Sequence, residues 1–256
     1  MAKCKCEKFG DYRVFAYLCV RIMSNAYFQF KQFVVRQERC AMKVGTDGTL
    51  LGAWAHGGQR ILDIGTGTGL IALMMAQRHP EAQVTAIDID AEAVSQACEN
   101  VAASPFCQRI TVVEGDICQP DGLPLQAGYD AIVCNPPYFN DSLICPDDQR
   151  TVARHTTTLS YCDLMTAAAI LLADEGELSV VIPFDCKSRL EAEASLAGLS
   201  KTRECSIKTT PRKAPRRYLL AFAKHPAALE TTEGVLELEP GKRSEWYYEL
   251  TKDFYL

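Results

Sequence analysis

Residues 60–69, Arg-Ile-Leu-Asp-Ile-Gly-Thr-Gly-Thr-Gly, decide the fold. A short apolar run that ends at a glycine predicts a buried strand. The glycines that follow allow a tight turn and let the backbone approach a ligand at the N-terminus of the next helix, which we expect over residues 70–78. Dinucleotide-binding folds use the spacing GxGxxG, and Leu70 stands where the third glycine would be needed. An NAD-dependent oxidoreductase is therefore disfavoured.

Strand and helix patterns alternate outward from this turn. We expect strands at 60–64, 83–88, 109–114, 129–134, 177–183, 201–209 and 217–223 and helices at 91–102, 160–173 and 186–199. Alternation of this kind predicts an α/β fold with a seven-stranded, mostly parallel sheet and helices on both faces. The last two strands are joined by a short connection, which predicts an antiparallel edge strand. A strand at 235–239 and a helix from Ser244 complete the pattern, and we expect the aromatic tail to pack against the body.

Composition limits the class of protein. The 256 residues are 48% hydrophobic with a net charge of −5, which is typical of a globular protein and excludes a disordered or collagen-like chain. The twelve cysteines include no CxxC pair, so we expect no structural metal and a reduced, cytoplasmic protein. Cys98 and Cys134 lie in apolar runs, where cysteine behaves as a small hydrophobic residue. No stretch of 18 apolar residues is present, so we expect no membrane span.

The chain divides into three parts in this interpretation. Residues 14–22 are apolar after a basic start, and we interpret residues 1–22 as an N-terminal extension outside the fold, with translation beginning at Met23. Residues 24–59 form a cap or lid segment, and residues 60–256 form the catalytic domain. The sequence leaves the oligomeric state open.

Acidic residues follow the strands next to the glycine turn. Asp88 ends the second strand, where a carboxylate can accept hydrogen bonds from both hydroxyls of a ribose. Asp116 follows the third strand, from which it can contact an adenine amino group. Either aspartate could instead be a turn or cap residue, and we assign Asp90 to the cap of the following helix.

An acid two residues before GxGxG resembles the first motif of class I S-adenosylmethionine-dependent methyltransferases. This resemblance implies that S-adenosyl-L-methionine is the cofactor and that its binding residues are Asp63, Gly65, Thr66, Gly67, Gly69, Asp88 and Asp116.

The fourth strand runs into Asn135-Pro136-Pro137-Tyr138. Two prolines make this loop rigid and remove two N–H donors, so the Asn135 amide oxygen and the Pro136 carbonyl can both accept hydrogen bonds from one amino group. Tyr138 offers a face on which a planar base can stack. The motif resembles that of N-methyltransferases that act on adenine, cytosine, guanine or the glutamine amide. This resemblance assigns catalysis to the four residues of the motif and leaves the substrate open.

A longer match narrows the substrate. Residues 42–54 (MKVGTDGTLLGAW), the aromatic segment 28–33, Tyr138-Phe-Asn140 and Ala153-Arg-His155 are similar to the bacterial family that methylates N6 of adenine-37 beside the anticodon of a valine tRNA. The similarity covers residues 24–256. It implies that Lys43, Thr46 and Asp47 cover the cofactor pocket as a lid; the alternative is that Thr46 and Asp47 simply begin a helix.

The distribution of charge suggests where RNA would bind. Residues 201–217 carry seven basic residues and one acid, Glu204. We assign Arg212, Lys213, Arg216 and Arg217 to the phosphate backbone; the alternative is a solvated surface. Two further groups could add contacts with phosphate or flank the flipped nucleotide: Arg36, Arg39 and Lys43, and Arg150, Arg154 and His155. No long inserted target-recognition domain is present, which favours a structured RNA over DNA.

Alternatives remain at this point. A protein glutamine N5-methyltransferase would share the Asn-Pro-Pro-Tyr motif, although residues 24–59 are short for its substrate domain. An N-methyltransferase of rRNA or DNA is a second alternative. A non-catalytic RNA-binding protein of this fold is a third, but it should have lost Asn135 or a cofactor glycine, and neither is missing.

Overall fold

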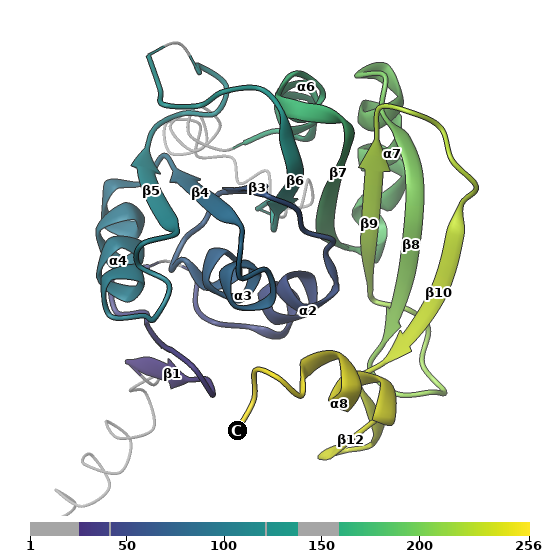
Figure 1. The fold of residues 1–256 in the computed structure, drawn as a ribbon. Coiled ribbons are helices and arrows are strands. Elements are labelled where there is room, and N and C mark those ends of the chain that lie inside the picture. Colours follow the sequence, from purple (N-terminus) through teal and green to yellow (C-terminus); the bar gives the residue numbers. More distant parts are fainter. Residues whose placement is uncertain (1–25, 41, 121, 138–158) are drawn as a thin grey trace, which may run out of the picture.

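A computed structural model describes residues 26–40, 42–120, 122–137 and 159–256. Its centre is an eight-stranded sheet in the order β10-β8-β9-β7-β6-β3-β4-β5 (Figure 1). The strands are β3 (Arg60–Ile64), β4 (Gln83–Asp88), β5 (Ile110–Glu114), β6 (Tyr129–Cys134), β7 (Leu172–Pro183), β8 (Ser200–Lys208), β9 (Arg217–Ala223) and β10 (Glu230–Val235). The mostly parallel sheet predicted from the sequence is confirmed, because β3 to β7 all run parallel to their neighbours within this group.

Two details of the predicted sheet are wrong. The sheet has eight strands rather than seven, because β10 pairs in parallel with β8 along residues 230–235. The antiparallel strand is not at the edge, because β9 lies between β7 and β8 and pairs antiparallel with both. The predicted hairpin of β8 and β9 is nevertheless present, and its connection, residues 209–216, projects from one end of the sheet.

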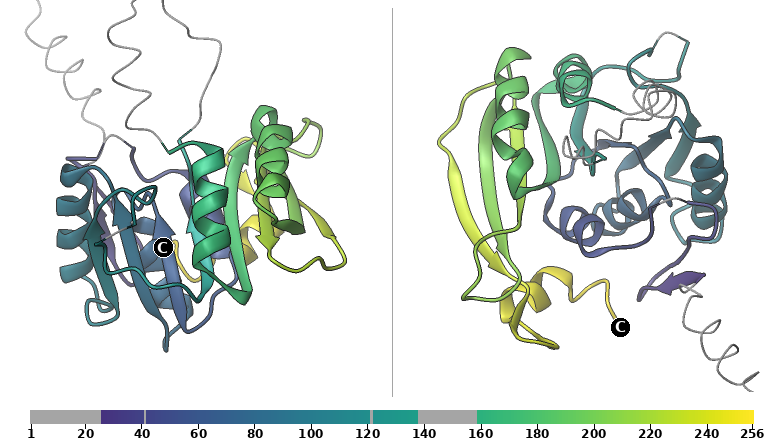
Figure 2. Two further views of the ribbon diagram at one scale, coloured as in Figure 1. Left: turned by 90° about the horizontal axis from the view of Figure 1, so that it is seen from above. Right: turned by 180° about the vertical axis from the view of Figure 1, so that it is seen from behind.

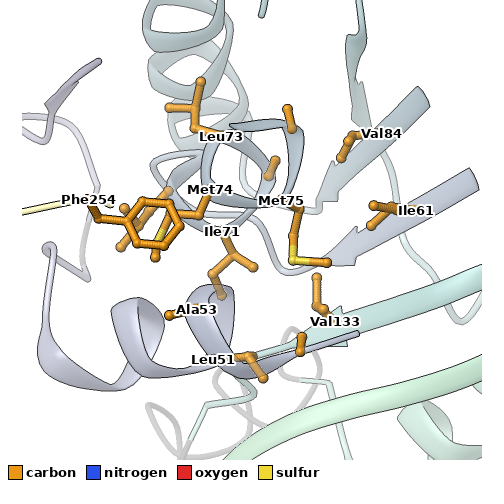
Figure 3. Close-up of a cluster of buried hydrophobic side chains, with 14 of the residues drawn as sticks. Leu51, Ala53, Ile61, Ile71, Leu73, Met74, Met75, Val84, Val133 and Phe254 are labelled. Atoms are coloured by element: carbon orange, nitrogen blue, oxygen red, sulfur yellow. The ribbon is translucent and has the colours of Figure 1, made fainter. Parts of the chain in front are cut away.

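Helices cover both faces of the sheet, as the two views of Figure 2 show. On one face lie α2 (Thr46–Trp54), α3 (Leu70–Arg78) and α4 (Ala91–Ala102), and on the other lie α6 (Tyr161–Leu171) and α7 (Lys187–Leu196). Side chains therefore alternate along the strands: Ile61 and Val133 pack under the first group of helices, whereas Leu62 and Ile132 pack under the second. Figure 3 shows Leu51 and Ala53 of α2 together with Ile71 and Met75 of α3 over Ile61, Val84 and Val133 of the sheet.

The described parts of both terminal regions pack together. The hairpin of β1 (Tyr27–Gln29) and β2 (Val34–Arg36) places Phe30 and Phe33 in a stack with ring centroids 4.8 Å apart. The ring of Tyr255 lies 5.8 Å from that of Phe30, and the N–H of Lys31 donates to the carbonyl of Phe254 at 2.8 Å. The predicted packing of the aromatic tail is thus confirmed.

A short helix leads into this tail. Helix α8 (Glu245–Thr251) begins after Ser244, whose side chain accepts a hydrogen bond from the N–H of Tyr247. A small ribbon of β11 (Glu237–Glu239) and β12 (Lys242–Arg243) precedes the helix; β11 lies within the strand predicted at 235–239, and β12 was not predicted. A one-turn 3₁₀ helix, η1 (Phe184–Cys186), follows β7.

The expectation for the cysteines is correct at one position and wrong at the other. Cys134 is buried in the sheet, with 1% of its surface exposed. Cys98 is exposed. Helix α4 is amphipathic and buries Ala93, Ala97 and Val101, so Cys98 lies on its solvent side. In the described part of the chain, no helix has the length and apolar character needed to cross a membrane.

Phe254 tests whether the tail belongs to the core. Only 1% of this residue is exposed, and Figure 3 shows its ring beside Met74 of α3. We expect Phe254→Ala to lower the free energy of unfolding by about 3–5 kcal/mol, because it leaves a cavity. The control is Leu256→Ala, at a residue that is 82% exposed, with an expected change within about 0.5 kcal/mol. Urea unfolding measures both, and equal effects would contradict a buried tail.

Candidate active site

The carboxyl ends of the central parallel strands bring the predicted site residues to one edge of the sheet. Residues 65–69 follow β3, Asp88 ends β4, Asp116 follows β5 and Asn135 follows β6. The registers agree with this arrangement, because Ile64 pairs with Ile87 on one side and with Cys134 on the other. Ligands of open parallel sheets bind at this edge.

The glycine turn has the backbone conformation that the sequence predicts. Gly65, Gly67 and Gly69 have φ angles of +69°, +54° and +80°, in the left-handed region that disfavours residues with a side chain. A Cβ added at Gly65 or Gly67 would meet no atom within 4 Å. The backbone of these two glycines therefore faces open space, into which a ligand can enter.

Asp63 holds the turn from below. It is fully buried, and its Oδ2 accepts hydrogen bonds from Thr66 Oγ1 at 2.6 Å and from the N–H of Ala72 at 3.1 Å. Its Oδ1 is buried and has no hydrogen-bond partner among the described residues. Burial raises the pKa of Asp63 to about 7, against the lowering effect of the two hydrogen bonds, and Asp88 adds to the rise.

Asp88 and Asp116 each fix a local turn. Asp88 Oδ2 accepts from the N–H of Gly67 at 2.8 Å, and its Oδ1 accepts from the N–H of Asp90 at 3.0 Å. Asp116 Oδ1 accepts from the N–H of Cys118 at 2.9 Å. Asp90 caps α4, as predicted, by accepting from the N–H of Glu92. Because a carboxylate oxygen has more than one lone pair, these contacts are compatible with ligand binding, and the cofactor roles of Asp88 and Asp116 remain predictions.

A cavity of about 350 Å³ opens beside the turn, within the range of small-molecule sites. Its walls come from the segment before and within the first turn of α2, from the glycine turn and the start of α3, and from Asn135 and Arg217. The lining residues are Met42, Lys43, Val44, Gly45, Thr46, Asp47, Gly48, Gly65, Thr66, Gly67, Thr68, Leu70, Ile71, Asn135 and Arg217. Seven residues predicted for cofactor binding or catalysis thus meet here, whereas Asp63, Gly69, Asp88, Asp116, Pro136 and Pro137 do not line the cavity.

The predicted lid residues lie in this wall. Thr46 and Asp47 form the first turn of α2, whose N-cap is Gly45 without a side-chain capping bond. The segment thus starts a helix and also lines the cavity, and the role of Lys43, Thr46 and Asp47 as a lid over the cofactor stays a prediction. Met42 was not predicted as a site residue. It lines the cavity, and its Sδ accepts a hydrogen bond from Asn135 Nδ2 at 3.8 Å.

The position of Arg217 differs from that of an open phosphate contact. Its Nε pairs with Asp47 Oδ1, and its side chain lines the cavity together with Asn135. The pair joins β9 to the first turn of α2. The sequence contains one signal for this position: Arg217 is the first residue of an antiparallel strand, and such a strand begins beside the end of the strand that it pairs with. In the structure that partner is β7, and Arg217 pairs with its last residue, Pro183.

The basic segment 201–217 separates into two groups. Lys201 pairs with Glu204 at 2.5 Å, Arg203 with Glu177 at 2.6 Å and Lys208 with Glu233 at 2.7 Å. The other group is exposed in the connection between β8 and β9, and no residue in it forms an ion pair with another described residue. This group comprises Arg212, Lys213 and Arg216.

The additional candidates for RNA contact also divide. Arg39 pairs with Glu99 at 2.7 Å, Arg36 is exposed, and Lys43 lies in the cavity wall. The remaining candidates lie outside the described residues. They are Tyr138, Arg150, Arg154 and His155.

Known proteins resemble most of this chain. Residues 49–204 match the model of the methyltransferase small domain family. A tRNA1(Val) (adenine(37)-N6)-methyltransferase from Bacteroides thetaiotaomicron is 48% identical over 91% of this chain and 99% of its own. One from Histophilus somni is 42% identical over 90% and 97%. Among solved structures, a predicted O-methyltransferase from Agrobacterium tumefaciens superposes with a TM-score of 0.62 at 20% identity, over 81% of this chain and 96% of its own, and shows the same fold.

Asp63 makes stability depend on pH. Its pKa is raised from 3.8 to about 7 on folding, so between these values the folded protein binds more protons than the unfolded chain, and stability falls as the pH rises. An amide in place of this carboxyl group would not titrate. We therefore expect Asp63→Asn to gain stability relative to the native protein between about pH 4 and about pH 7 and to show a constant difference above about pH 8. Urea unfolding across this range measures the difference, and one that does not change with pH would contradict the prediction.

Proposed function

We infer the reaction from the family: the chain belongs to the tRNA1(Val) (adenine(37)-N6)-methyltransferases. We propose that it transfers the methyl group of S-adenosylmethionine to the exocyclic N6 amine of adenine-37, next to the anticodon of a valine tRNA. The observation that carries this proposal is that the glycine turn and Asn135 line one and the same cavity. A cofactor held by the turn and an amine held by Asn135 would meet there.

The residues of the cavity fit the cofactor. The open backbone at Gly65 and Gly67 can accept a ligand in direct contact, and the positive end of α3 begins immediately after Gly69. On the other wall, Lys43 and Arg217 are cations that can face a carboxylate. When bound, S-adenosylmethionine supplies an electrophilic methyl group on a sulfonium and leaves as S-adenosylhomocysteine, while the amine exchanges one N–H bond for the N–CH₃ bond and releases that proton to solvent.

Asn135 acts on the amine that receives the methyl group. Its amide oxygen and the carbonyl of Pro136 accept hydrogen bonds from the two amine hydrogens, which directs the nitrogen lone pair toward the methyl group. Pro136 is buried and Pro137 half-buried, so the loop is fixed before the substrate arrives. Because the methyl group is already electrophilic, positioning supplies most of the catalytic contribution from this chain.

The exposed cations of the connection between β8 and β9 support binding of RNA. The connection joins the end of β8 to the start of β9, and Arg217 at that start faces the same cavity as Asn135. Phosphates held there would lie near the reacting base. A base flips out of a loop at lower cost than out of a duplex, which suits a nucleotide beside an anticodon. A cytoplasmic location, where tRNA is modified, and the division into a cap of residues 24–59 and a catalytic domain of residues 60–256 belong to the same proposal.

Incubation with S-adenosylmethionine carrying a labelled methyl group and bulk tRNA, followed by nucleoside analysis, tests the proposed reaction. We expect the label in N6-methyladenosine from a valine tRNA. Label in protein would support glutamine methylation instead, and label in another nucleoside would contradict the assignment of the amine.

Asn135→Ala tests the proposed catalytic group. We expect the rate of methyl transfer at saturating substrates to fall about 100-fold or more, because the amine loses the acceptor that orients it. The Kd of S-adenosylhomocysteine should stay within about twofold of the native value, since the variant keeps the glycine turn. Stopped-time methylation assays and calorimetric titration measure the two quantities. Full activity in this variant would refute the role of Asn135.

A triple variant tests the proposed RNA contacts. Replacing Arg212, Lys213 and Arg216 by Ala removes the exposed cations of the connection. Each lost phosphate contact should reduce the slope of log Kd against log salt concentration by about 0.7–0.9, so we expect a total reduction of about 2–3.

The matched control removes three exposed lysines around α8: Lys31, Lys242 and Lys252. It changes the net charge of the protein equally, and we expect its salt slope to match that of the native protein. Equal slopes for the triple variant and the native protein would show that the connection is ordinary solvated surface.

A further inference from the structure

Phe184 is an exposed aromatic residue at the carboxyl ends of the central strands, the same end of the sheet where the cavity lies. It opens η1 directly after β7, and 51% of its surface is exposed. Strand β7 lies beside β6, with Val180 opposite Cys134, so both strands end on the side where Asn135 follows β6. Single exposed hydrophobic residues are common on proteins, and it is the surroundings of Phe184 that indicate a role.

The backbone and ring of Phe184 are held in place. Its N–H donates to the carbonyl of Arg216 at 3.0 Å, which fixes η1 to the start of β9. Its ring centroid lies 5.9 Å from that of Tyr218, at an interplanar angle of 31°. Tyr218 is itself buried, and Lys187 Nζ lies 4.8 Å from the centre of its ring. The aromatic ring is thus supported by a buried neighbour and leaves part of its surface open to solvent.

Phe184 is also attached to the segment that would hold RNA, where the connection between β8 and β9 meets the start of β9. Its hydrogen-bond partner, Arg216, belongs to the exposed cations of the connection, while Pro183 pairs with Arg217, which lines the cavity with Asn135. Proteins that bind unpaired nucleotides combine cations for the backbone with aromatic rings on which bases stack. The neighbouring acid, Asp185, is exposed and would repel a phosphate, which favours a base over a phosphate at this position.

We propose that Phe184 is a stacking platform for the nucleobase next to the methylated adenine. The inference rests on the proposed function and adds a binding subsite to it. Rotating one adenine out of the loop removes a stacking partner from its neighbours. The ring of Phe184 would replace that partner, while Arg212, Lys213 and Arg216 hold the flanking phosphates.

Variants at this position separate the ring from its bulk. Phe184→Leu keeps an apolar side chain and removes the ring, and Phe184→Tyr keeps the ring. The control is Leu196→Ala, at an 83% exposed residue near the end of α7. With an anticodon stem-loop RNA as substrate, we expect Phe184→Leu to raise the Kd of the RNA between about 5-fold and about 100-fold. Phe184→Tyr and Leu196→Ala should stay within about twofold, and all three should keep the salt slope, because no charge is removed.

An abasic RNA identifies the partner. Removing the base on the 5′ or the 3′ side of the target adenine, one at a time, should abolish the difference between Phe184→Leu and the native protein at one of these two positions. Two results with RNA would overturn the proposal: equal affinity of Phe184→Leu and native protein for the intact RNA, or the same loss of affinity with both abasic RNAs. A lower melting temperature and weaker S-adenosylhomocysteine binding by Phe184→Leu without RNA would also overturn it, because the ring would then serve the protein itself.

The same assay keeps the two levels of inference apart. If the native protein methylates the stem-loop while Phe184→Leu behaves identically, only the stacking platform fails. If the native protein forms no N6-methyladenosine in either the stem-loop or tRNA, the proposed function fails.

Discussion

The left-handed turn between β3 and α3 is the constraint on which the site depends. Its glycines adopt positive φ angles, and the N–H groups of Gly65 and Thr66 both donate to the carbonyl of Ile87 in the next strand, at 2.9 and 3.0 Å. Carboxylates from two neighbouring strands complete the support: Asp63 holds Thr66 from within the core, and Asp88 accepts from Gly67. The pairing of β3 with β4 thus fixes a bare stretch of backbone toward open space, and the cavity is built around it.

Segments far apart in the sequence close this cavity. The first turn of α2 supplies one wall and β9 another, and the ion pair between Asp47 and Arg217 joins them. The same strand continues from the connection that carries the exposed cations. A single strand therefore links the surface that would hold RNA to the wall of the cavity, and Phe184 is attached to it through the carbonyl of Arg216. The net charge of −5 is compatible with this arrangement, because the cations that remain exposed are local.

The sequence predicted the parts of the fold that local patterns determine. Helices α3 and α4 begin and end where expected, since a glycine turn precedes one and Asp90 caps the other. Strand β10 was not predicted, because its sequence, ETTEGV, has no apolar run; it is a strand because it pairs with β8. The partner of Arg217 could not be predicted either, because Asp47 lies in a distant segment and only the tertiary fold brings the two together. Cys98 is exposed because of the orientation of α4 on the sheet. The apolar residues next to Cys98 in the sequence did not predict this orientation.

The central claim is that cofactor and adenine meet in the cavity between the glycine turn and Asn135. A crystal structure of the protein with S-adenosylhomocysteine and an anticodon stem-loop RNA tests it most directly. The account predicts the sulfur atom inside this cavity and the N6 amine of the flipped adenine donating to Asn135 Oδ1. The nitrogen should lie about 3–3.5 Å from the position that the methyl carbon on the sulfur would occupy. A sulfur atom bound outside the cavity, or an adenine amine held by other residues, would contradict it.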